Sequence, residues 1–130
     1  MDNGEVFRRY LIALTKPDAI PDIVAAEFIA HDMPPPGNRE VLIMFRRVVM
    51  TAFPDQAVEI LDIVSEGDRL AARWQATQTH TGQFQDLPAT GKRIIFDGHE
   101  FVRIRDGKIA ERWVMLHPSI EQMLAQLRAA

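Results

Sequence analysis

The stretch KRIIFDGHEFVRIRDGKIAERWVMLH, residues 92–117, decides the fold. Apolar and polar residues alternate along both of its halves, with the period of two that is typical of β-strands. The halves are joined by Asp106-Gly107, a pair that favours a two-residue hairpin turn because both residues tolerate positive φ angles. The stretch therefore predicts two antiparallel strands, at residues 92–105 and 108–117.

A second hairpin is predicted before this one. Residues 57–65 and 69–80 have the same strand-like pattern, and Glu66-Gly67-Asp68 provides a tight turn between them. Residues 81–91 form the loop between the two hairpins. The sequence thus predicts an antiparallel sheet of four strands in the second half of the chain.

The first half of the chain has helical periodicity. We expect a helix over 2–16 that is capped by Asp2, a short helix over 22–29, and a third helix that begins after Asn38 and ends at Phe53. A last helix should follow Pro118 and Ser119, which lie directly after the final strand. Since most helices precede the strands, we expect an α+β fold in which a curved antiparallel sheet forms a cone, with the N-terminal helices over its concave face.

The composition excludes several classes of protein. The chain has 130 residues, 47% of them hydrophobic and 25% charged, with a formal net charge of -3, which fits one globular domain with no affinity for nucleic acid or anionic membranes. It has no cysteine, so thiolate catalysis and cysteine-based zinc sites are excluded. The N-terminal residues do not resemble a signal peptide, and no apolar run reaches the roughly 18 residues of a membrane span. We expect a cytoplasmic protein.

The hairpin turn also predicts which side chains share a face. If Asp106-Gly107 is a two-residue loop, Arg105 lies opposite Lys108, and counting back places Glu100 opposite Trp113. The predicted pocket face then carries Trp74, His80, Phe96, Glu100, Trp113, Met115 and His117. A mostly apolar face with a few polar groups is typical of a small-molecule site. A bulge would shift this register by one residue and turn one strand's side chains to the other face.

Six short stretches occur in an order and spacing that resemble a known family. They are HD at 31–32, FPD at 53–55, EGDRLAARW at 66–74, THTGQF at 79–84, PATGK at 88–92 and RDGKIAERW at 105–113. Together they resemble the SnoaL-like polyketide cyclases, which share the cone-shaped fold of nuclear transport factor two and ketosteroid isomerase. The resemblance covers about residues 5–128, so we treat 1–130 as a single SnoaL-like domain.

The resemblance implies a deep pocket, a dimeric assembly and ring closure by intramolecular aldol chemistry without metal or cofactor. It also implies an acid/base residue at the inner end of the last strand, four residues after the tryptophan of that strand. In this sequence the position is occupied by His117. A histidine titrates near neutral pH, so His117 is our candidate for the catalytic base; the alternative is a strand-end histidine with no chemical role.

Glu100 is the second catalytic candidate. A carboxyl group on an apolar face is either paired with an arginine or has a raised pKa. Carboxyl groups with a raised pKa serve as general acids and bases. We expect His31 at the rim of the pocket, above a lining formed by Trp74, Phe96, Trp113, Met115 and His80. Neither an HExxH motif nor a tight pair of histidines is present, so we expect no metal and no cofactor.

Two classes of function fit these residues. The first is a cofactor-free acid/base enzyme, such as an isomerase or cyclase, that acts on a small apolar carbonyl compound. The second is a non-catalytic binder of a similar organic ligand, or a dimeric structural module. In either case we expect a homodimer, because an outer sheet face that carries Val58, Ile60, Val64, Phe101, Val114 and Leu116 is too apolar to leave in water.

Overall fold

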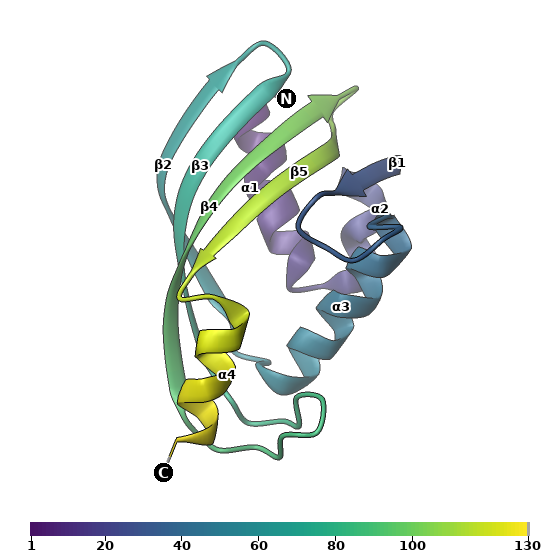
Figure 1. The fold of residues 1–130 in the computed structure, drawn as a ribbon. Helices are drawn as coiled ribbons and strands as arrows, with labels where there is room; N and C mark the ends of the chain where they lie inside the picture. Colours follow the sequence, from purple (N-terminus) through teal and green to yellow (C-terminus); the bar gives the residue numbers. More distant parts are fainter. Residues whose placement is uncertain (130) are drawn as a thin grey trace.

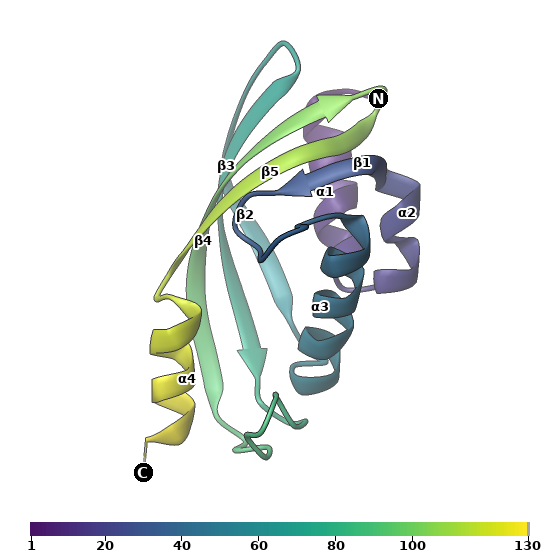
Figure 2. The same cartoon turned by 45° about the vertical axis from the view of Figure 1, so that its right-hand side comes forward.

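A curved, open five-stranded sheet holds helices against its concave side (Figures 1 and 2). The computed structural model describes residues 1–129. The strands are β1 (Val24–Ala30), β2 (Ala57–Glu66), β3 (Arg69–Thr79), β4 (Arg93–Arg105) and β5 (Lys108–His117). Their order in the sheet is β1-β5-β4-β3-β2, and only β1 runs parallel to its neighbour. This architecture confirms the predicted α+β class and the curved sheet.

The helices begin where their capping residues predict. They are α1 (Asn3–Leu14), the one-turn η1 (Pro17–Ala19) and α2 (Ile20–Ile23), α3 (Arg39–Ala52) and α4 (Ile120–Arg128). The side chains of Asp2 and Asn38 accept backbone N–H bonds at the starts of α1 and α3, and Ser119 forms a capping box with Gln122. Within residues 1–129, no helix combines the length and apolar character that crossing a bilayer requires.

The predicted helix over 22–29 is wrong. Helical structure ends at Ile23, and Val24–Ala30 forms the edge strand β1 beside β5. The alanines of this segment favour a helix, but the free edge of β5 offers unpaired backbone groups that an extended segment can satisfy. The strand also buries Val24, Phe28 and Ala30 in the core, and residues 31–32 follow directly after it.

A bulge in the second hairpin changes the predicted faces. Ile104 pairs with Ile109, but Arg103 pairs with Glu111, so Ala110 is an extra residue in β5. Every residue of β5 beyond the bulge is therefore turned to the face opposite the predicted one. Glu100 lies opposite Val114 instead of Trp113.

Candidate functional site

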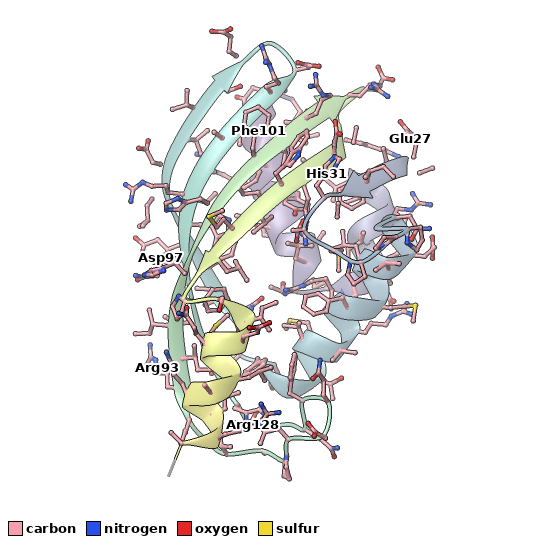
Figure 3. All side chains as sticks on the ribbon, viewed as in Figure 1. Glu27, His31, Arg93, Asp97, Phe101 and Arg128 are labelled. Carbon is pink, nitrogen blue, oxygen red and sulfur yellow. The ribbon has the colours of Figure 1, made fainter. Side chains whose placement is uncertain are left out.

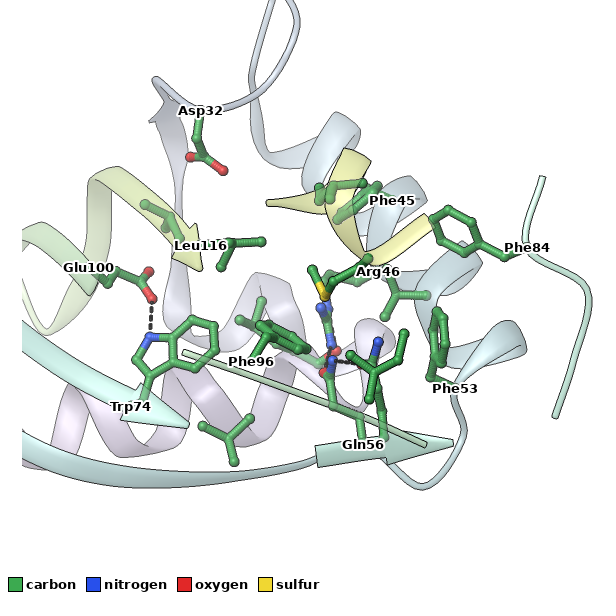
Figure 4. A pocket seen from close by; sticks show the side chains of 18 of the residues that line it. Asp32, Phe45, Arg46, Phe53, Gln56, Trp74, Phe84, Phe96, Glu100 and Leu116 are labelled. Atoms are coloured by element: carbon green, nitrogen blue, oxygen red, sulfur yellow. Dashed lines mark hydrogen bonds between the residues drawn. The ribbon is translucent and has the colours of Figure 1, made fainter. Parts of the chain in front are cut away.

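A cavity of about 130 Å³ lies between the concave face of the sheet and helices α1, α3 and α4 (Figure 4). Its lining is mostly apolar and includes Phe45, Phe53, Trp74, Phe84, Phe96, Val114 and Leu116. A cavity of roughly 150 Å³ with such a lining can hold a benzene molecule. The space therefore suits a small organic ligand.

Glu100 is the buried carboxyl group of this cavity. Its side chain projects inward from β4, and the residue is 4% exposed. Tyr10 Oη donates to Glu100 Oε2 at 2.6 Å, and Trp74 Nε1 donates to Oε1 at 3.1 Å (Figure 4). Burial raises the pKa of Glu100, and this effect outweighs the opposing influence of Arg112 and of the two donors.

Arg112 connects Glu100, through Tyr10, to Asp32, which also lines the cavity. Its Nη1 donates to Tyr10 Oη at 2.8 Å, so the tyrosine hydroxyl hydrogen is free to point at Glu100. Its Nε and Nη2 donate to the two carboxylate oxygens of Asp32 at 3.0 and 2.9 Å. Burial alone would lower the pKa of Arg112, but Tyr10, Glu100 and Asp32 together raise it, and the guanidinium stays charged.

Arg46 brings a second guanidinium group to the cavity wall from α3. It is 8% exposed, and its Nε donates to the Leu14 carbonyl oxygen at 2.8 Å. Its Nη2 donates to Gln56 Oε1, and Gln56 Nε2 donates in turn to Gln78 Oε1 at 2.6 Å. Burial, together with the positive charge of Arg112, lowers the pKa of Arg46 to about 10. The group is still a cation at neutral pH.

Gly98 allows Trp74 to form part of the cavity wall. A Cβ atom at position 98 would lie 2.1 Å from Trp74 Cζ2, so only glycine lets the indole lie across β4. The ring also packs edge-on against Phe96, with 5.9 Å between centroids. Trp74, Phe96 and Glu100 thus lie on the inner face, where the sequence placed them.

The predicted pocket positions of His117, Trp113 and Met115 are wrong. The Ala110 bulge turns all three side chains to the outer face, where His117 is exposed and lies opposite Asp97. The residues that β5 contributes to the cavity are Arg112, Val114 and Leu116 instead. The structure therefore separates His117 from Glu100 by the thickness of the sheet, and the two cannot share a substrate.

His31 also lies on the outer face instead of at the rim. Its ring stacks on Trp113 with 4.6 Å between centroids, and its Nε2 lies 2.6 Å from Glu111 Oε2. Phe101 packs edge-on against the Trp113 ring, with 5.5 Å between centroids, and Figure 3 labels His31 and Phe101 on this part of the sheet. Of residues 31 and 32, only Asp32 lines the cavity.

His80 is buried behind the cavity and does not line it. Its Nδ1 accepts the Thr90 backbone N–H at 3.2 Å and lies 3.0 Å from Thr90 Oγ1, while its ring packs against Phe53. These contacts hold together the two ends of the loop between the hairpins. Burial lowers the pKa of His80, which keeps the ring neutral.

Three polar groups of the cavity, Arg46, Arg112 and Gln56, were not predicted as pocket residues. Arg46 lies on the same face of α3 as Leu42, Ile43 and Val49, and this apolar periodicity could have identified it. Arg112 was assigned to the wrong face, and Gln56 has no pattern that distinguishes it from a surface amide. Gln78, in contrast, lies on the same inner face of β3 as Trp74, as strand alternation predicts.

Comparison with known proteins gives a consistent picture. The family model for SnoaL-like polyketide cyclases matches residues 5–127. None of the curated proteins compared matches the chain.

Solved structures with the same fold cover nearly the whole chain. IdmH from Streptomyces antibioticus, a suggested polyketide cyclase, has 27% sequence identity and a TM-score of 0.81, with 99% of this chain and 100% of that chain covered. AclR from Streptomyces galilaeus, a suggested hydroxylase, has 25% identity and a TM-score of 0.77, with 95% and 93% covered. A SnoaL-like protein from Jannaschia sp. CCS1, at 20% identity and a TM-score of 0.82 with 98% and 93% covered, shares the fold.

Proposed function

The chain belongs to the SnoaL-like polyketide cyclase family, and on this premise we propose that its cavity catalyses cofactor-free proton transfer on a small, mostly apolar carbonyl compound. One observation carries the proposal: Glu100 is a buried carboxyl group with a raised pKa on the wall of an apolar cavity. Such a group exchanges protons more readily near neutral pH than an ordinary glutamate does. The similarity to IdmH supports ring closure as the overall reaction.

In the proposed reaction, Glu100 removes a proton from the carbon next to a carbonyl group. The C–H electrons move onto the carbonyl oxygen, which gives an enolate and a neutral Glu100. The enolate carbon then attacks a second carbonyl carbon of the same molecule, which forms a C–C bond while the electrons of that C=O π bond move onto its oxygen. The alkoxide takes the proton back from Glu100, which returns to the carboxylate. Alternatively, where the enolate is conjugated with a C=C bond, Glu100 returns the proton to another carbon. The first outcome is a cyclisation and the second an isomerisation. Each Glu100 oxygen accepts one hydrogen bond in the structure and keeps a lone pair for the substrate.

Tyr10, Trp74 and Arg112 act as positioning residues in this proposal. The two donors fix the plane of the Glu100 carboxyl group, and Arg112 fixes the direction of the Tyr10 hydroxyl. Asp32 neutralises Arg112. This arrangement holds the base in place and leaves Glu100 without a direct ion pair in residues 1–129, which preserves its raised pKa.

A test with 2-tetralone, a small ketone with acidic α-protons, addresses the proposal directly. We expect the protein to accelerate exchange of these protons in D2O, followed by NMR, above the rate in buffer. The base must be ionised, so the rate should rise with pH, with a midpoint above the ordinary glutamate pKa of about 4.3. Saturable binding of the ketone without exchange would instead support a non-catalytic binding protein.

We also propose that the outer sheet face joins two copies of the chain. The prediction that Val58, Val114 and Leu116 lie on this face is wrong, because they line the cavity, and so is that for Ile60, which pairs with the inward-facing Trp74 and packs against the core. The face is nevertheless apolar, because it exposes Leu61, Val64, Phe101, Trp113 and Met115, the last to 74%. An exposed apolar surface of this kind is typical of a protein interface.

Light scattering at micromolar concentration should give a mass of about twice the 14.8 kDa of one chain. Met115→Glu should shift this mass toward the monomer, because a charge in the buried centre of an apolar interface is costly. Met44 is similarly exposed, at 66%, but lies on α3, so Met44→Glu is a matched control that should remain dimeric. A monomeric wild-type protein would rule out the interface.

A further inference from the structure

Arg46 is a buried cation without a counterion. Its side chain lines the cavity, yet no carboxylate oxygen of residues 1–129 lies within ion-pairing distance of its guanidinium group. Arg112, the other cavity arginine, is held by both oxygens of Asp32. A buried charge is costly unless it is paired. The contrast between the two arginines indicates that Arg46 pairs with something that the folded chain does not supply.

Two side chains that line the cavity keep hydrogen-bond donors that no acceptor in residues 1–129 occupies. The protein hydrogen bonds of Arg46 use Nε and Nη2, so within the described residues Nη1 has no acceptor. Gln78, which is 5% exposed and also lines the cavity, uses its Oε1 to accept from Gln56, which leaves its amide N–H groups without an acceptor in residues 1–129. A guanidinium and an amide donor on one wall match the two oxygens of a carboxylate.

Glu100 and Arg46 lie apart on the cavity wall. Figure 4 shows Glu100 beside Trp74, and Arg46 farther along the cavity near Gln56, with Phe53 and Phe84 beyond it. The apolar side chains of Phe96 and Leu116 lie between them. A ligand that reaches from Glu100 to Arg46 therefore meets a proton acceptor, an apolar segment of the wall, and then a cation that has no counterion in residues 1–129.

We propose that the cavity binds small keto acids, with the ligand carboxylate on Arg46 and Gln78 and an apolar segment between this group and the carbonyl end at Glu100. The carbonyl end rests on the proposed function, whereas the carboxylate site depends on Arg46 alone. The ligand carboxylate supplies the counterion that Arg46 lacks. It also fixes which carbon of the substrate faces the base.

Benzoate and benzamide test the carboxylate site because they have the same shape and differ in charge. Hydrogen bonds to charged groups contribute about 1.5–3 kcal/mol, so wild-type protein should bind benzoate about 10- to 100-fold more tightly than benzamide in calorimetric titrations. Equal affinities, or tighter binding of benzamide, would overturn the proposal without any variant.

Substitutions of Arg46 test whether this side chain causes the preference for benzoate over benzamide. Arg46→Gln should reduce the ratio of the two affinities to about one, while Arg46→Lys, which keeps the charge, should retain a preference for benzoate. Arg47 is next to Arg46 on α3 but is exposed and paired with Asp18 at 2.9 Å, so Arg47→Gln is the matched control and should behave as wild type. Retention of the full preference in folded Arg46→Gln would contradict the proposal. If Arg46→Gln does not fold, the ratio of the two affinities in the wild-type protein and in Arg46→Lys tests the proposal instead.

The same titration separates this proposal from the catalytic one. Glu100→Gln should keep the preference for benzoate, because the hydrogen bonds of Glu100 go to Tyr10 and Trp74 and not to Arg46 or Gln78. A protein that prefers benzoate but does not exchange 2-tetralone protons has the carboxylate site without the proposed chemistry. A protein that exchanges the protons but binds both probes equally has the chemistry without the carboxylate site.

Discussion

Replacing Glu100 with glutamine should lower the rate of 2-tetralone proton exchange by about two to four orders of magnitude, the usual contribution of a general base. Glutamine has nearly the same shape, and its carbonyl oxygen can still accept a hydrogen bond from Tyr10 or Trp74. It cannot accept a proton from carbon at neutral pH. The loss should therefore appear in the exchange rate, measured by NMR in D2O, while the folded structure is retained in circular dichroism.

Two variants on the outer face serve as controls for this experiment. Glu111→Gln removes a carboxylate that lies near His31 outside the cavity, and it should leave the exchange rate unchanged. His117→Ala should also have no effect, because His117 is exposed on the far face of the sheet. A large loss in His117→Ala, with little loss in Glu100→Gln, would contradict the proposed role of Glu100 and favour the base predicted from the sequence.

The local patterns of the sequence predict most of the fold. Strand alternation, the Asp106-Gly107 turn and the helix caps depend on neighbouring residues, and each is found where it was expected. The strand β1 was missed because its conformation depends on pairing with β5, which lies about eighty residues later in the chain. No local pattern in Val24–Ala30 reports such a distant partner.

The site was harder to predict because one extra residue in a strand determines the face of the sheet on which all the following side chains of that strand lie. Trp74, Phe96 and Glu100 lie on strands whose pairing is continuous, and they face the cavity as expected. The extra residue Ala110 turns the following residues of β5 over, and an alanine carries no signal for a bulge, unlike a glycine with a positive φ angle. Because of this inversion, β5 presents an arginine and its hydrogen-bond network to the cavity, and the predicted histidine base lies on the outer face.

Arg112→Met should lower the free energy of unfolding by about 3–5 kcal/mol, the usual cost of removing one partner from a buried ion pair. The guanidinium binds both oxygens of Asp32 and the Tyr10 hydroxyl, and Tyr10 in turn binds Glu100. Methionine fills similar volume but leaves two carboxyl groups in the region with no cation between them. Urea unfolding followed by tryptophan fluorescence measures the change.

An arginine on the surface shows why this effect should be specific to the cavity. Arg103 also binds two carboxylates, Asp68 at 3.0 Å and Glu111 at 3.3 Å, but its side chain is 34% exposed. Water can replace those contacts, so Arg103→Met should cost much less than Arg112→Met. Adding Asp32→Asn to Arg112→Met should recover part of the loss, because the unpaired carboxylate is removed as well. Equal losses in Arg112→Met and Arg103→Met would show that the buried network contributes no more than a surface ion pair.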